Sequence, residues 1–253
     1  YGNDKPDLRF ALEIQDVTDI FRNSSFTIFA KSIENGSVVR AVPGPNCGSR
    51  SVADRMNSWA QGEGAPGMGY IIFSENSAKG PIANALGIEK SVEMKTLFNL
   101  NDGDALFFSC ASESEAANLA GKARVKIATD RELIEKNIFK FCWIVDYPMF
   151  EKDENTGKIE FSHNPFSMPQ GGMKALLNEN PLDILAYQYD LVCNGIELSS
   201  GAIRNHVPEI MYKAFEIAGH NPEVVDNKFP AMINAFKFGA PPHGGIAPGI
   251  DRI

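Results

Sequence analysis

Two acidic residues flank the strongest turn signal in the sequence. Asp190 and Glu197 lie on either side of Asn194-Gly195, in the segment "LAYQYDLVCNGIELSSGAIRNH". Asn-Gly between apolar runs predicts a β-hairpin with a two-residue turn. That turn pairs Val192 with Glu197 and Asp190 with Ser199. Because side chains alternate across a strand, the two carboxylates are predicted to share one face as diagonal neighbours.

The carboxylate pair has two interpretations. Mg²⁺ binds one or two carboxylates together with substrate phosphates, so the pair could hold this ion beside a nucleotide. The alternative is two solvated acids on an exposed sheet face, since charged side chains usually face water. The small residues of "ELSSGAIR" favour the first interpretation, because they leave room for a ligand or for another backbone.

Arg204 is the next charged residue after the hairpin. It follows Glu197 by seven positions, and a regular strand would therefore place the two on opposite faces. A β-bulge, which we predict at Ser199-Ser200-Gly201, would bring Arg204 onto the carboxylate face. There it could bind a carboxylate with two parallel hydrogen bonds. The alternative is an ordinary surface arginine.

The four histidines offer weaker signals. His163, in "FSHNPFSMP", is either a turn residue with local partners or a ligand-binding residue. His243 lies in "APPHGG", a Pro/Gly-rich loop of the kind that often carries function. His206 and His220 flank a predicted helix and are interpreted as surface or capping residues.

The elements that position these residues fall into three parts. Residues 1–20 form a lead in which "LRFALEI" alternates apolar with polar residues and predicts a half-buried strand. Residues 21–133 predict the order ββαβαβα, an α+β unit rather than a doubly wound parallel sheet. Its strands are "SFTIFAKS", "SVVRAV", "MGYIIFS" and "ALFFSCAS", and its helices are "SRSVADRMNSWAQG", "KGPIANAL" and "SESEAANLAGKARVKI".

Residues 134–253 contain the hairpin. Two strands, "IFKFCWIVDYPMFE" and "IEFSHNPF", are predicted before it. A helix follows it, with Pro208 in its first turn and Gly219 just past its end, and a second helical stretch is predicted to bend at Pro230. The closing "GIAPGIDRI" predicts a short strand, a turn and the first turn of a helix. Apolar surface is expected to be exposed in this part.

Composition narrows the class of protein. The 253 residues are 43% hydrophobic and 22% charged, as in ordinary globular proteins. The net charge of −8 and the absence of a Lys/Arg cluster argue against a wide nucleic-acid-binding surface. No uncharged apolar run of about 18 residues predicts a membrane span. Scattered cysteines without a Cys-x-x-Cys pair predict a reducing, cytoplasmic setting and no zinc site; they are Cys47, Cys110, Cys142 and Cys193.

Four segments together resemble the bacterial-type aspartyl-tRNA synthetases: "YGNDKPDLRF", "SHNPFSMP", "YDLVCNGIELSSGAIRNH" and "KFGAPPHGGIAPGIDRI". The resemblance covers the whole chain. Residues 21–133 resemble the family's GAD insertion domain, a two-layer α/β unit. Residues 1–20 and 134–253 resemble parts of the class II catalytic domain, which is built on an antiparallel sheet. The resemblance implies a fragment, with the anticodon-binding domain, the first two signature motifs and the end of the third outside this chain.

The resemblance also implies an activity and residue roles. Members of the family are aspartate–tRNA ligases. They activate L-aspartate with ATP to aspartyl-adenylate and then transfer the aspartyl group to the tRNA 3′ end. By resemblance, His163 and Arg204 contact aspartate, and Asp190 and Glu197 hold Mg²⁺. ATP binds Glu197 and the third-motif residues Gly249, Ile250, Asp251 and Arg252. The partners are L-aspartate, ATP and tRNA; the parent is expected to be a homodimer, and the isolated chain inactive.

Two departures and one alternative accompany this resemblance. Many members have His-His-Pro where this chain has His163-Asn164-Pro165, and Gly-Gly-Gly-Ser where it has residues 199–202. These changes put the fine geometry of the aspartate pocket in doubt. The alternative function is a non-catalytic, GAD-bearing binding subunit of a tRNA-dependent amidotransferase. Glu197 and Arg252 argue against it, because a pure binding module needs no nucleotide signature.

Overall fold

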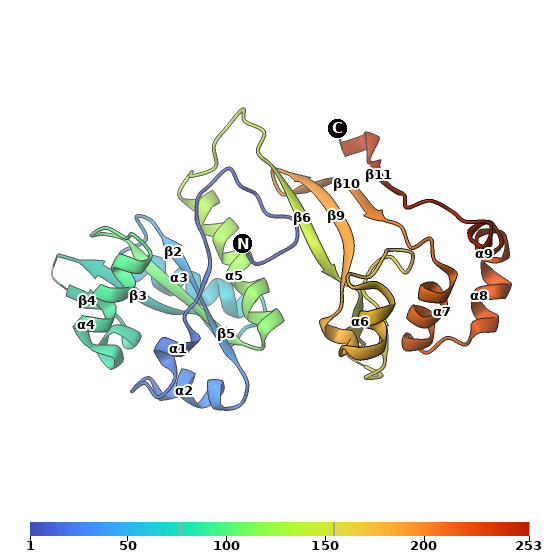
Figure 1. Ribbon diagram of the computed structural model, residues 1–253. Coiled ribbons are helices and arrows are strands. Elements are labelled where there is room, and N and C mark those ends of the chain that lie inside the picture. Colours follow the sequence, from blue (N-terminus) through green and yellow to red (C-terminus); the bar gives the residue numbers. More distant parts are fainter. Residues whose placement is uncertain (76, 154, 253) are drawn as a thin grey trace. The chain divides into compact units, whose positions relative to one another are not determined.

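The computed structural model describes residues 1–75, 77–153 and 155–252, which form two units. The first comprises Tyr1–Lys140 and the second begins at Phe141 (Figure 1). Both combine helices with antiparallel sheet, which confirms the predicted α+β class. The domain boundaries placed after residues 20 and 133 stay predictions. No helix among the described residues is long and apolar enough to cross a membrane.

The first unit is built on a five-stranded sheet in the order β1-β2-β5-β3-β4, with every neighbouring pair antiparallel. Its elements are β1 (Gln15–Asp16), α1 (Thr18–Phe21), α2 (Thr27–Glu34), β2 (Val38–Gly44), α3 (Arg50–Gly62), β3 (Gly69–Ser74), β4 (Ser77–Lys79), α4 (Pro81–Leu97), β5 (Ala105–Ala111) and α5 (Glu113–Asp130).

Helices cover both faces of this sheet, so the unit has three layers rather than the two expected. Alternate residues of β5 point to opposite sides: Phe107 lies in the core beneath α3 and α5, and Phe108 lies in the core beneath α1, α2 and α4. At the start of α5, the backbone N–H and the hydroxyl of Ser112 both donate to the Glu115 carboxylate. These hydrogen bonds from the residue before α5 to a carboxylate in its first turn agree with the predicted helix start.

The segment "SFTIFAKS" forms a helix, and its prediction as a strand was wrong. α2 buries Phe29 and Ile33 on one helical face, while Ile28, which would share a strand face with Phe26, is 67% exposed. Phe29 packs against Phe21 with ring centroids 5.0 Å apart. A short apolar run is compatible with the two-residue repeat of a strand and with the 3.6-residue repeat of a helix. The packing of Phe29 on Phe21 favours the helix. The order ββαβαβα is corrected accordingly, with helices preceding β2.

The lead also departs from the predicted strand. Only β1 pairs with β2. Phe10 and Leu12 are buried, as the alternation predicted, but their backbone carbonyls do not join a sheet ladder. Instead they accept hydrogen bonds from the guanidinium of Arg124 on α5, as does the carbonyl of Asp7. The lead is thus held by a buried side chain.

The second unit carries a four-stranded antiparallel sheet in the order β11-β10-β9-β6, beside the two-stranded β7-β8. Its elements are β6 (Phe141–Pro148), β7 (Phe150–Lys152), β8 (Ile159–Phe161), α6 (Gly172–Asn178), the 3₁₀ turn η1 (Pro181–Asp183), β9 (Leu185–Cys193), β10 (Ile196–Ile203), α7 (Pro208–Ile217), α8 (Pro222–Lys228), α9 (Pro230–Lys237), β11 (Gly244–Pro248) and the 3₁₀ turn η2 (Ile250–Arg252).

One face of this sheet exposes apolar side chains, as expected from the sequence. Phe141, Trp143 and Val145 alternate along β6, and each is more than half exposed. On α7 the predicted start holds, with Pro208 as its first residue, and Gly219 follows its end at a positive φ. The predicted break at Pro230 separates α8 from α9.

Candidate active site

The hairpin forms with the predicted turn. Asn194 and Gly195 both have positive φ (51° and 84°), the conformation that a type I′ turn requires. Cys193 pairs with Ile196, and Val192 pairs with Glu197. Glu197 therefore lies on the face of β9 that also carries Asp190, two positions before Val192.

The β-bulge exists, but it comes earlier than predicted. The register of β9 with β10 shifts between Glu197 and Ser199, so Asp190 pairs with Ser200 and not with Ser199. One extra residue changes which side chains share a face. Beyond the bulge, the positions on the Asp190 face include Ala202, which pairs with Gln188, and then Arg204. The bulge thus puts Arg204 on the same face as Glu197.

Asp190 is buried and has a partner that sequence reasoning missed. The hydroxyl of Tyr147 donates to Asp190 Oδ2 at 2.6 Å, and both residues are 8% exposed. The ring of Tyr147 also meets the imidazole of His163 edge-on, with centroids 4.8 Å apart. His163 itself is exposed. Asp190 and His163, which are 27 positions apart in the sequence, are thus joined through one tyrosine.

The closing segment lies along β10. β11 pairs with it from Ser199 to Ile203, and Gly249 donates from its backbone N–H to the carbonyl of Leu198 at 2.8 Å. The next three residues form the predicted helical turn, η2. From there Arg252 donates to the backbone carbonyl of Glu197 at 2.8 Å. Gly249 and Arg252 are therefore placed beside Glu197.

Of the remaining third-motif residues, Ile250 is 89% exposed and Asp251 is exposed as well.

Arg204 has a fixed backbone and an available side chain. Its N–H donates to the carbonyl of His243 at 2.8 Å, and it forms an isolated bridge with Ser167. The side chain is half-buried. Within the described part of the chain, no hydrogen bond or ion pair engages its guanidinium. A partly desolvated guanidinium without an internal partner suits a carboxylate ligand.

Three further polar residues near the site make hydrogen bonds with the local backbone. Asn164 accepts the N–H of Phe166 with its side chain, and its carbonyl accepts the amide of the buried Gln188 at 3.2 Å. His206 and His243 each have Nδ1 near a backbone carbonyl two positions earlier. These contacts shape the loops around the site, and no ligand role follows from them.

The carboxylate pair fits one kind of metal site. No cluster of three or more His, Cys, Asp or Glu suited to a metal ion occurs in the described ranges, so a cage made of protein ligands alone does not form there. Asp190 and Glu197 offer two carboxylates on one face. Mg²⁺ is held in this way when substrate phosphates and water complete its coordination. The residues present therefore fit Mg²⁺ together with a nucleotide.

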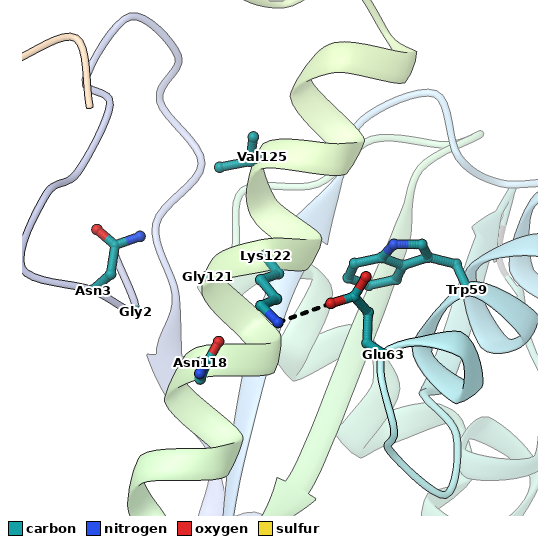
Figure 2. A pocket seen from close by; sticks show the side chains of 8 residues that line it. All are labelled: Gly2, Asn3, Trp59, Glu63, Asn118, Gly121, Lys122 and Val125. Carbon is teal, nitrogen blue, oxygen red and sulfur yellow. Dashed lines mark hydrogen bonds and ion pairs between the residues drawn. The ribbon is translucent and has the colours of Figure 1, made fainter. Parts of the chain in front are cut away.

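A hollow of about 540 Å³ in the first unit is a weaker candidate. Figure 2 shows Lys122 reaching from α5 to Glu63, with their charged atoms 2.8 Å apart. The other lining residues are Gly2, Asn3, Trp59, Asn118, Gly121 and Val125. Its two charges neutralise each other, and none of its groups offers a catalytic arrangement.

The chain is similar to known proteins along its whole length. The family model described as "tRNA synthetases class II (D, K and N)" matches residues 1–253. The chain is 56% identical over 255 residues to the aspartate–tRNA(Asp/Asn) ligase of Gluconobacter oxydans (strain 621H). It is 59% identical over 260 residues to the protein of the same name from Rickettsia bellii (strain OSU 85-389). Each alignment covers 100% of this chain and 43% of the relative, so the chain spans less than half the length of these relatives.

Among solved structures, the aspartyl-tRNA synthetase from Entamoeba histolytica is 24% identical, with a TM-score of 0.33, over 52% of this chain and 22% of that one.

Proposed function

The chain belongs to the class II tRNA synthetases (D, K and N), and on that basis we propose that it serves as part of an aspartate–tRNA ligase. The relatives reported above are named aspartate–tRNA(Asp/Asn) ligases. Their names support a ligase rather than the amidotransferase subunit considered as an alternative.

One observation carries the proposal. Arg252 donates a hydrogen bond to the backbone carbonyl of Glu197. The bulge brings Arg204 to the same sheet face as Glu197 and Asp190. Two carboxylates suited to a nucleotide with its magnesium ion thus share a sheet face with Arg204, whose guanidinium has no partner among the described residues, and Arg252 lies beside one of the two. These charges support the proposal, because a nucleotide with its metal ion and a carboxylate substrate each need groups of opposite charge.

The proposed reaction has two steps. The α-carboxylate of aspartate attacks the α-phosphate of ATP, which forms aspartyl-adenylate and releases pyrophosphate. The 3′-terminal hydroxyl of tRNA then attacks the activated carbonyl carbon, which forms the ester and releases AMP. Neither step needs a protein nucleophile. Catalysis rests on positioning and on stabilising charge as it develops.

Each side chain has a proposed role in this scheme. Arg204 binds the side-chain carboxylate of aspartate, and His163, exposed beside Tyr147, contacts the same substrate. Gly249–Arg252 line the ATP site, with the guanidinium of Arg252 near the phosphates. Asp190 and Glu197 would hold Mg²⁺, which when bound supplies positive charge to the phosphates.

Aspartate-dependent ATP–pyrophosphate exchange tests the proposal. The assay is run on this chain and on the chain extended at both ends to the length of its relatives, with aspartate, asparagine and lysine compared as substrates. We expect exchange in the extended chain with aspartate alone. Exchange driven by asparagine or lysine, or none in the extended chain, would overturn the assignment to aspartate.

A further inference from the structure

We propose that Tyr147 is a positioning residue: its hydroxyl orients Asp190 as a metal ligand, and its ring packs against His163 and limits where that side chain can lie. This inference rests on the proposed function, because it concerns the same site. No motif in the sequence indicated Tyr147: it lies in an apolar run, and simple alternation would group it with exposed residues of β6.

A second β-bulge brings Tyr147 to the site. β6 pairs with β9 regularly up to Val145, opposite Tyr189, and the register then shifts so that Tyr147 lies opposite Ala186. Asp146, between them, has φ of 59°, an unusual value for a residue other than glycine. Without the shift, Tyr147 would share the exposed face of Trp143 and Val145. With it, the side chain points to the face of Asp190.

The bulge is held in place by a specific contact. Gln170 donates from Nε2 to Asp146 Oδ1 at 2.6 Å. A left-handed conformation at a non-glycine residue is strained, and it persists where surrounding contacts hold it in place. β-bulges are often found next to active sites, where they redirect a side chain.

The hydrogen bond of Tyr147 constrains how Asp190 can bind a ligand. At 2.6 Å it has the length of a charge-assisted O–H···O⁻ bond, and it engages Oδ2. Within the described ranges no hydrogen bond reaches Oδ1, which leaves that oxygen for a cation. Hydrogen-bond partners of a ligating carboxylate fix its orientation, and their loss typically lowers metal affinity or activity 10–100-fold.

The aromatic ring has a separate effect from the hydroxyl. It meets the His163 imidazole at 87°, with centroids 4.8 Å apart, and restricts where that exposed side chain can lie. Tyr147→Phe therefore removes the hydrogen bond to Asp190 and keeps the ring beside His163. Tyr147→Ala removes the support of His163 as well.

The test compares variants in the extended chain described above. For Tyr147→Phe we expect the half-saturating Mg²⁺ concentration for exchange to rise about tenfold, with the KM for aspartate changed less than twofold. For Tyr147→Ala the KM for aspartate should rise too. The matched control is Tyr212→Phe, which removes the same kind of hydrogen bond, from Tyr212 to Asp226, between α7 and α8 of the same unit.

Metal binding supplies a readout that does not depend on turnover. Mn²⁺ is titrated into the extended chain with ATP, and free Mn²⁺ is measured by electron paramagnetic resonance. The inference predicts weaker Mn²⁺ binding for Tyr147→Phe than for the unchanged protein and Tyr212→Phe. Coinciding titrations for all three would overturn it. Mn²⁺ binding that depends on Tyr147, in a protein without aspartate-dependent exchange, would refute the ligase proposal and leave this inference standing.

Discussion

Nη1 of Arg252 donates a hydrogen bond of 2.8 Å to the backbone carbonyl of Glu197, and it lies 3.5 Å from the Glu197 carboxylate. The two residues are 55 positions apart. The contact fastens the turn after β11 to β10 and leaves part of both side chains accessible, with 48% of Arg252 and 24% of Glu197 exposed. A cation and a carboxylate are thereby set side by side where a nucleotide phosphate and a metal ion are proposed to bind.

The first prediction concerns the charge of Glu197. Glu197→Gln keeps the shape of the side chain and removes a ligand of the proposed magnesium ion. In the extended chain we expect ATP–pyrophosphate exchange to fall at least about 10²-fold, the size typical for losing one electrostatic contact in a transition state, while the melting temperature changes little. Glu216→Gln, which removes an exposed carboxylate on α7, is the control. Exchange within twofold of the unchanged protein would contradict the role of Glu197.

The second prediction concerns the close approach of β10 and β11. A Cβ at Gly201 would lie 2.4 Å from the carbonyl oxygen of Gly245 and 2.5 Å from Cε2 of Tyr189, so Gly201→Ala must push the two strands apart. We expect a loss of about 2 kcal/mol in the free energy of unfolding, within the range for overpacked sites, and a loss of exchange activity when the same substitution is made in the extended chain.

Gly245→Ala is the control, since a Cβ there would meet nothing within 4 Å. It should stay within about 0.5 kcal/mol of the unchanged protein. Trp143 packs edge-on against Tyr189, with centroids 6.0 Å apart, and its fluorescence in a Trp59→Phe background reports unfolding of this unit. Equal stability of the two alanine variants would show that the strands can adjust.

The third prediction concerns the buried Arg124, which is 1% exposed. Besides its three carbonyl acceptors, the guanidinium stacks on the rings of Tyr1 and Phe10, 4.6 and 4.1 Å from their centroids. Arg124→Leu leaves buried carbonyls without donors, at about 1–3 kcal/mol each. We expect a total loss near 3 kcal/mol, because the lead can detach and hydrate its carbonyls.

Lys122→Met, two positions before Arg124 on α5, removes a half-exposed charge and should cost less than about 1 kcal/mol. Denaturant unfolding is followed by Trp59 fluorescence in a Trp143→Phe background, which isolates the first unit. Similar losses for the two variants would argue that Arg124 contributes no more than a surface charge.

The fourth prediction concerns pH. Burial alone would raise the pKa of Asp7, but hydrogen bonds from the guanidinium and backbone N–H of Arg9 outweigh it and hold the pKa below its ordinary value. A carboxyl whose pKa is lower in the folded state stabilises the fold above its unfolded pKa of about 3.9. That contribution is lost as the pH falls through the folded pKa.

Asp7→Asn should therefore be less stable than the unchanged protein at pH 5–7, and the difference should shrink below about pH 4. Arg9→Gln breaks the same pair and should show the same dependence. Denaturant midpoints read from Trp59 at several pH values measure it. A stability difference independent of pH would mean that Asp7 acts through its backbone or packing and not through its charge.

Much of the site follows from local signals in the sequence. The Asn-Gly turn predicts the hairpin, because two successive residues with positive φ are favoured by those residue types, and the alternation of strand side chains then places Asp190 and Glu197 on one face. The start and end of α7 and the interruption between α8 and α9 follow from Pro208, Gly219 and Pro230 for the same reason: a few neighbouring residues determine the backbone angles.

Only the tertiary structure decided the features that depend on contacts between residues far apart in the sequence. "SFTIFAKS" becomes a helix because Phe29 packs on Phe21 and Phe21 on Phe108, contacts that no local pattern contains. The position of the bulge after Glu197 and the existence of the one at Asp146 depend on how adjacent strands align, and strand register is set by packing across the whole sheet. Tyr147 reaches Asp190 only through that alignment, which is why residue types and spacing could identify the carboxylates but not the tyrosine that orients one of them.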